Sequence, residues 1–150
     1  MIPRKPETQV RRRAPSSAIL VAAGIVVGLA LSAVHAQMAP PSEHKGLTVA
    51  GLGVIAEDSL SKIGLTGHKM QLRAITIAPG GQIAKHSHAT RPGLVKVIAG
   101  TWTVGTPSGE KDVSAQDSEA ILEDKDTIHW FFNHTDKPAT ALVCDIVPSG

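Results

Sequence analysis

The chain has 150 residues, enough for one domain of ordinary size, and its formal net charge is +2. Five of its 15 basic residues and one of its 13 acidic residues precede residue 37, so the part that follows has 10 basic and 12 acidic residues and a net charge of −2. That part has no basic patch for nucleic acid, and nothing in it indicates a membrane-binding surface. The composition therefore argues against both of these function classes.

The first 36 residues contain the three parts of a secretory signal peptide. Residues 11–13 are consecutive arginines, residues 18–31 form an unbroken run of 14 apolar or small residues, and Val34 and Ala36 stand at the −3 and −1 positions of a cut before Gln37. A membrane-spanning helix needs about 20 apolar residues, and this run is shorter. We therefore predict a cleaved signal peptide over residues 1–36 and a periplasmic or secreted protein without membrane attachment. An uncleaved N-terminal anchor is the alternative.

The remainder predicts one β-rich domain. Residues 37–45 are polar and contain proline, which indicates a disordered lead-in to a single domain over residues 46–150. Residues 59–63 fit a turn or a short helix, and Pro79-Gly80-Gly81 is expected to separate two strands. Short strands about 8–12 residues apart, with glycine and proline turns between them, are typical of an all-β barrel or sandwich. Strands are expected at residues 46–58, 69–78, 82–88, 94–99, 102–104, 111–113, 119–122, 129–133 and 139–147.

The single cysteine, Cys144, lies in the last of these expected strands. One cysteine cannot form an intramolecular disulfide, so the domain depends on its hydrophobic core for stability. We expect Cys144 to be a small buried apolar residue rather than a reactive thiol.

Two histidines one residue apart, His86 and His88, carry the main functional signal. On a strand their side chains point to the same face of the sheet, and their Cβ atoms lie about 6.5–7 Å apart. Both imidazoles can then bind one metal ion at about 2.0–2.1 Å. A third histidine, His129, lies in another expected strand. We therefore predict that His86, His88 and His129 bind one divalent metal ion inside a small barrel.

The arrangement resembles the cupin family in two motifs. Gly80, five further residues, His86-Ser87-His88 and then Gly100 are similar to the first cupin motif, and His129, three residues and Asn133 are similar to the end of the second. The resemblance covers roughly residues 70–147. It implies a cupin-type double-stranded β-helix, a jelly-roll barrel, with the metal near its middle.

Two positions depart from the family's pattern. The glutamate ligand that the family carries after the histidine pair is Gly93 here, and Asp124 and Asp126 replace the proline and glycine usual before the second-motif histidine. The first departure leaves three neutral nitrogen ligands and no protein anion for the metal. Glu123, Asp124 or Asp126 could supply a carboxylate, but we expect all three to form a solvated turn.

The resemblance implies an exported metal-binding cupin with a divalent iron, manganese or zinc ion and a small-molecule substrate or ligand. The activity it favours is that of a mononuclear, dioxygenase-like oxidoreductase, and it also implies a homodimer. Two alternatives stay open, a non-catalytic barrel that binds or senses a small ligand and a zinc-type hydrolase or isomerase. No catalytic residue is identified from the sequence.

Two residues are candidates for substrate binding. Arg91 follows the histidine pair in an expected turn, where it is either solvated or faces the cavity and binds a carboxylate. Phe131 shares a face with His129 and is therefore a candidate for the cavity wall, whereas Trp130 points to the other face and is expected to pack structurally. The other histidines of the domain are expected at the surface: His44, His68 and His134.

Overall fold

The computed structural model describes residues 38–150, so the predicted signal peptide lies outside the described residues. Eight strands, a short α-helix and a single 3₁₀ turn make up this part of the chain. In residues 38–150 no helix has both the length and the apolar character needed to cross a membrane. The elements are β1 Lys45–Ile55, α1 Glu57–Leu60, the 3₁₀ turn Ser61–Ile63, β2 His68–Ser87, β3 Gly93–Ala99, β4 Thr101–Thr106, β5 Gly109–Ser114, β6 Ile121–Glu123, β7 Ile128–Phe132 and β8 Ala139–Pro148.

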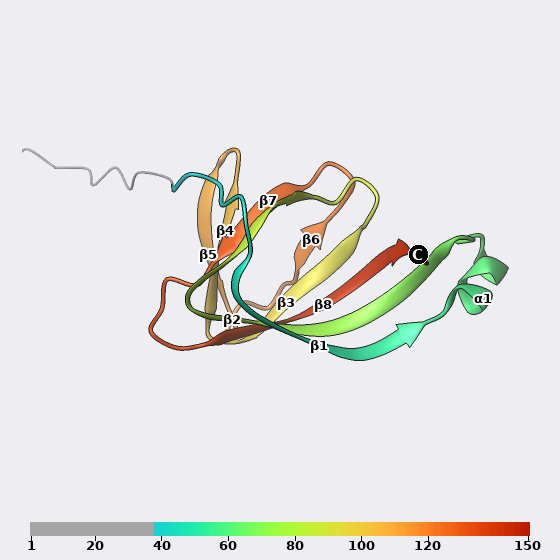
Figure 1. The fold of residues 1–150 in the computed structure, drawn as a ribbon, viewed down its shortest axis with the longest axis horizontal. Helices are drawn as coiled ribbons and strands as arrows, with labels where there is room; N and C mark the ends of the chain where they lie inside the picture. Colours follow the sequence, from blue (N-terminus) through green and yellow to red (C-terminus); the bar gives the residue numbers. More distant parts are fainter. Residues whose placement is uncertain (1–37) are drawn as a thin grey trace, which may run out of the picture. The chain divides into compact units, whose positions relative to one another are not determined.

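All strand pairs are antiparallel, in the order β5-β4-β7-β2-β8-β3-β6, and β1 pairs with β2 as well. The first half of β2 lies between β1 and β8, and its second half pairs with β7 (Figure 1). The long strand β2 therefore has three partner strands, β1, β7 and β8. The architecture is that of a jelly-roll β-barrel, which confirms the predicted all-β class.

The prediction that Pro79-Gly80-Gly81 separates two strands was wrong. β2 continues through these residues as one strand of 20 residues. The strand bends here because Gly80 adopts a left-handed conformation with φ of 67°. Gly80 N–H donates to the Asn133 carbonyl at 2.9 Å, and Asn133 N–H donates to the Gly81 carbonyl at 3.0 Å, so the backbone groups at the bend stay paired.

Residues 38–45 differ from the predicted disordered lead-in because they contact β2. The Pro41 carbonyl accepts a hydrogen bond from Lys85 N–H at 2.9 Å, and the Glu43 carbonyl accepts one from Gln82 Nε2 at 3.0 Å. Lys45 is already the first residue of β1. These contacts satisfy polar groups that a disordered segment would leave to water.

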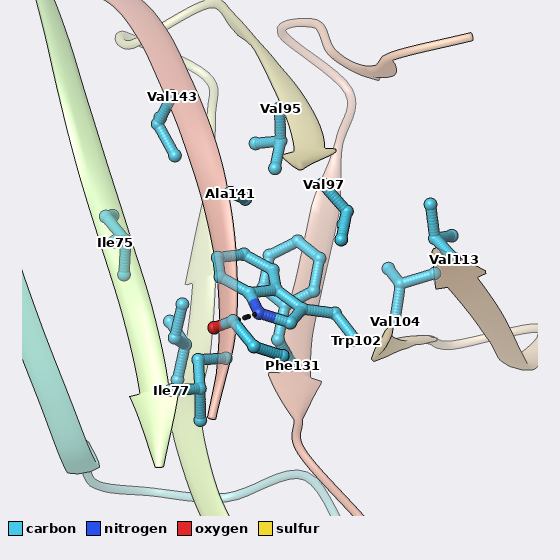
Figure 2. Packing of buried hydrophobic residues seen from close by; sticks show 12 residues of the cluster. Ile75, Ile77, Val95, Val97, Trp102, Val104, Val113, Phe131, Ala141 and Val143 are labelled. Atoms are coloured by element: carbon cyan, nitrogen blue, oxygen red, sulfur yellow. Dashed lines mark hydrogen bonds between the residues drawn. The ribbon is translucent and has the colours of Figure 1, made fainter. Parts of the chain in front are cut away.

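The core is formed by the inward-facing residues of the barrel strands (Figure 2). Alternate residues of β8 are buried, as expected for a strand with one face toward the interior. The rings of Trp102 and Phe131 lie 5.1 Å apart at the centre, and Trp102 Nε1 donates to the Ala139 carbonyl at 3.0 Å.

Cys144 is a free thiol on β8 that is only partly buried, which differs from the buried position expected for it.

Asn133 joins the bend of β2 to the turn between β7 and β8, and its side chain is fully buried. Its Nδ2 donates to the Ile77 carbonyl at 2.9 Å and to the Lys137 carbonyl at 2.8 Å. Its Oδ1 accepts from the N–H of Thr135 at 3.0 Å and from its hydroxyl at 2.7 Å. The amide therefore uses all of its hydrogen-bonding capacity within the fold.

We predict that Asn133→Ala lowers the free energy of unfolding by about 2–4 kcal/mol, because it leaves buried backbone groups without partners. Urea denaturation followed by circular dichroism measures this change. Thr135→Ala is the control, since it removes only the hydroxyl at the exposed end of the same network. A loss for Asn133→Ala no larger than that for Thr135→Ala would contradict this structural role.

Candidate metal centre

The pairing of β2 with β7 brings the three predicted histidines together. His86 and His129 are direct partners in this antiparallel ladder. His88 lies just beyond the end of β2, and its N–H donates to the Thr127 carbonyl at 3.0 Å, so its ring stays beside the other two. The three ring centroids are 4.6–4.9 Å apart. His88 and His129 are each 1% exposed, and His86 is half-buried.

Backbone carbonyls set the proton positions on two of these rings. His86 Nδ1 lies 2.8 Å from the Ala84 carbonyl oxygen, and His88 Nδ1 lies 2.7 Å from the Arg91 carbonyl oxygen. A carbonyl can only accept, so each Nδ1 carries the proton and each neutral ring has its lone pair on Nε2. The Nε2 atoms of both rings then face His129 Nε2, at 3.1 Å from His86 and 3.0 Å from His88. The one proton that His129 Nε2 can carry does not satisfy both lone pairs, whereas a cation does.

Glu123 adds a carboxylate to the three rings, and its place in a solvated turn was predicted wrongly. It ends β6 and is 2% exposed, whereas Asp124 and Asp126 are exposed as expected. Glu123 Oε1 lies 3.4 Å from His88 Nε2 and 3.3 Å from His129 Nε2. The carboxylate therefore approaches the same point as the imidazole nitrogens.

The position of Glu123 explains why glycine occupies position 93. Gly93 and Glu123 are direct partners in the β3–β6 ladder. A Cβ at Gly93 would lie only 2.9 Å from Glu123 Oε2, from the Asp145 Cβ and from the Cys144 carbonyl oxygen. A side chain at position 93 would therefore clash with β8 and crowd the Glu123 carboxylate. In the family's pattern the glutamate would lie at position 93 on β3. Here the carboxylate comes from Glu123 on the neighbouring strand β6.

These side chains fit a divalent metal ion. Their ligand atoms all lie within 4.8 Å of one another. Two ligands at right angles, each about 2.1 Å from one ion, are about 3.0 Å apart, as are the Nε2 atoms here. Glu123 Oε2 is buried and has no hydrogen-bond partner among the described residues, an arrangement that is costly without a nearby cation. We call the four side chains the histidine–glutamate cluster; they are His86, His88, Glu123 and His129.

Burial keeps the rings of His86 and His88 in the neutral form that a metal requires. It lowers the pKa of His86 to about 4, against the opposing effect of the Ala84 carbonyl, and the nearby His129, His88 and Arg91 lower it further. Burial also lowers the pKa of His88, although the Arg91 carbonyl and the Glu123 carboxylate oppose this change. Both rings are therefore ready to bind a cation at neutral pH.

A cavity of about 280 Å³ adjoins the cluster and is lined by His86 and Glu123. Arg91 and Phe131 also line it, so the structure places both predicted substrate-binding residues beside the cluster, and their role in binding stays a prediction. The ring of Phe131 lies 4.5 Å from that of His129. His44 is exposed, as expected, but it also lines the cavity mouth.

Trp130 lies away from this cavity. It is 1% exposed and fits closely against Gly105, where a Cβ would lie 2.0 Å from the indole nitrogen. Its packing agrees with the structural role expected for it. His68 and His134 are not among the residues that line the cavity.

Sequence reasoning missed Glu123 as a member of the cluster, and it missed two other charged residues near the cavity, Arg73 and Asp145. The alternation of inward-facing and outward-facing residues along β6 could have identified Glu123 as buried. Ile121 is partly buried and Leu122 exposed, so the next residue faces inward. The predicted strand ended at residue 122, one residue before Glu123. Asp145 had a similar signal, because it alternates with the buried Val143 and Val147 along β8.

Comparisons with known proteins agree with this fold. A family model described as a cupin domain matches residues 73–145. A predicted oxalate decarboxylase from Thermotoga maritima has a similar structure, with a TM-score of 0.54 and 13% identity over 72% of this chain and 93% of that one. The polyketide cyclase RemF from Streptomyces resistomycificus gives a TM-score of 0.53 and 19% identity over 76% of this chain and 72% of its own.

A cupin domain of an XRE family transcriptional regulator from Enterobacter cloacae is similar as well, with a TM-score of 0.51 and 16% identity over 67% of this chain and 96% of that domain. At these identities the likeness concerns the fold. No curated protein matches the sequence.

We predict that the metal-free protein loses thermal stability between pH 7 and pH 5. The unfolded chain takes up a proton on His86 as the pH falls through about 6.5, whereas the folded state does so only near pH 4, so acid favours unfolding in this window. Scanning calorimetry in a chelator at pH 7, 6 and 5 measures the effect.

The variant His86→Gln should show a smaller decrease, and His134→Gln, at an exposed position, should behave like the wild type. An unchanged pH dependence in His86→Gln would show that this ring does not titrate as described.

Proposed function

Because this chain belongs to the cupin superfamily, we propose that the histidine–glutamate cluster holds one divalent metal ion and that the protein is a metal-dependent oxidoreductase, similar to a mononuclear dioxygenase. Its substrate would be a small molecule bound in the adjacent cavity. One observation carries the proposal. Three imidazole nitrogens and one carboxylate oxygen of the buried Glu123 converge on one point. They have more lone pairs than there are protons to form hydrogen bonds between them.

The chemistry of the donor set favours a first-row divalent ion. Three neutral nitrogens and one carboxylate suit iron, manganese or zinc. An iron or manganese ion supplies Lewis acidity and one-electron redox chemistry, whereas zinc supplies Lewis acidity alone. The ion's identity therefore separates an oxidoreductase from a hydrolase or isomerase.

In the proposed function the chain's own residues would bind and orient the substrate in the cavity. The cavity wall is mostly aliphatic and aromatic, with Phe131 beside the ring of His129. Among the described residues that line the cavity, His44 is the only side chain outside the cluster of a type that commonly transfers protons. Chemistry in this site would therefore depend on the metal rather than on a separate acid and base.

The same scarcity of proton-transfer groups favours a second candidate function, a barrel that binds or senses a small ligand without converting it. The similar structures do not choose between the two. The names of two of them describe enzymes, and the third is a domain of a transcriptional regulator. Turnover of a substrate distinguishes the candidates.

We predict that the untagged protein, as the cell produces it, contains close to one divalent metal ion per chain. Plasma mass spectrometry measures the metal content. Glu123→Gln, which removes the negative charge and keeps the shape, should weaken metal affinity by about 10–100-fold or more. Glu119→Gln is the matched control at an exposed position. The double variant His86→Ala, His88→Ala should lose the metal entirely.

Iron or manganese would support the oxidoreductase and call for an oxygen-uptake screen. Zinc would favour hydrolysis or isomerisation. If the wild type holds no metal, or if the folded double variant retains it, the proposed function is wrong.

We also propose that the protein is exported, because residues 1–36 have the parts of a signal peptide. Cell fractionation with mass spectrometry of the purified N-terminus tests this proposal. A periplasmic or secreted chain that begins at Gln37 is the expected result. A chain in the cytoplasm with an intact N-terminus would contradict it.

A further inference from the structure

Two arginines of the cavity wall share one buried carboxylate, that of Asp145. Arg73 comes from β2, Arg91 from the segment before β3, and Asp145 from β8. Asp145 Oδ2 lies 2.7 Å from Arg73 Nη2 and 3.7 Å from Arg91 Nε. Both arginines line the cavity that adjoins the histidine–glutamate cluster. The two guanidinium groups beside Asp145 carry two positive charges against its one, and Glu123 of the cluster adds a second carboxylate to the lining of the same cavity.

The two guanidinium groups and the Asp145 carboxylate have more hydrogen-bond donors and acceptors than they use with one another. An arginine has five N–H donors. Arg73 Nε is buried and has no hydrogen-bond partner among the described residues, and neither has Asp145 Oδ1. A buried donor without an acceptor costs about 1–3 kcal/mol. An anion bound at this wall would supply the acceptor that Arg73 Nε lacks.

The rest of the cavity is unsuited to a polar ligand. Ile75, Val143 and Phe131 are among its apolar lining residues. No serine, threonine, asparagine, glutamine or tyrosine lines it among the described residues. The indole N–H of Trp102 is already bonded to the Ala139 carbonyl. A polyhydroxylated ligand would therefore leave most of its hydroxyls unpaired, which disfavours it strongly.

We propose that the cavity binds a small carboxylate with an apolar body, whose carboxylate is bound by Arg73 and Arg91. The volume of about 280 Å³ suits a small ligand, on the order of ten non-hydrogen atoms. A ligand bound there also lies beside His86 and Glu123, which line the same cavity. This inference deepens the proposed function, on which only that contact with the cluster depends.

The test measures binding of 4-methyl-2-oxopentanoate, an acid of this size, by isothermal titration calorimetry. Its methyl ester keeps the body and removes the charge, and 2,3,4-trihydroxybutanoate keeps the charge on a polyhydroxylated body of about the same size. The acid should bind at least about tenfold more tightly than either, since one charge-assisted contact is worth about 1.5–3 kcal/mol. Equal binding of acid and ester, or no binding of the acid, would overturn the proposal.

Arg91→Met is the main variant, because Arg91 is partly exposed and its loss leaves Arg73 paired with Asp145. It should weaken binding of the acid at least about tenfold and leave the ester unchanged. Lys62→Met removes an exposed cation elsewhere and should change neither. Asp145→Asn should strengthen binding of the acid, because it removes the charge that competes for both guanidinium groups. Unchanged binding of the acid to Arg91→Met would refute the assignment.

Metal content and melting temperature are recorded on the same samples, so this test fails separately from that of the proposed function. Metal retained without preference for the acid refutes the anion site alone. If a chain that holds no metal prefers the acid, and Arg91→Met removes that preference, the anion site is supported and the metal proposal fails.

Discussion

The register of the β2–β7 ladder is the constraint on which the rest of this structure depends. It places His86 opposite His129 and Ile83 opposite Phe131, so the imidazoles and the core side chains share one face. Strand side chains alternate, and a slip of one residue would turn His129 outward and Trp130 into the cavity. The bend of β2 at Gly80, held by the backbone of Asn133, lets the same strand pair with β8 at its other end.

The cluster illustrates a conflict between stability and function. Burial makes protonation of His86 unfavourable, and Glu123 Oε2 is buried without a hydrogen-bond partner in the described chain. Both features destabilise a metal-free barrel, and both favour a bound cation. The mostly aliphatic core beside the cluster, with the ring pair of Trp102 and Phe131 at its centre, helps the domain to tolerate that cost without a disulfide.

Two neighbouring groups of polar side chains border the cavity. One is the histidine–glutamate cluster, with neutral rings and a carboxylate, and the other is Asp145 with the guanidinium groups of Arg73 and Arg91. Gly93 connects them, because it pairs with Glu123 on one side and with Asp145 on the other. With no side chain of its own, it allows both buried carboxylates to approach its strand.

The sequence by itself determined the all-β class, the cupin motifs and three histidines that a strand pair could bring together, because alternation and turn residues act over a few neighbouring positions. Tertiary structure alone decided that β2 runs unbroken through Pro79-Gly80-Gly81, since the pairing of that bend comes from Asn133, far along the chain. It also decided that Glu123 lies beside the three histidines and that Arg73 pairs with Asp145. These contacts depend on which strands become neighbours, and local sequence patterns do not specify that order.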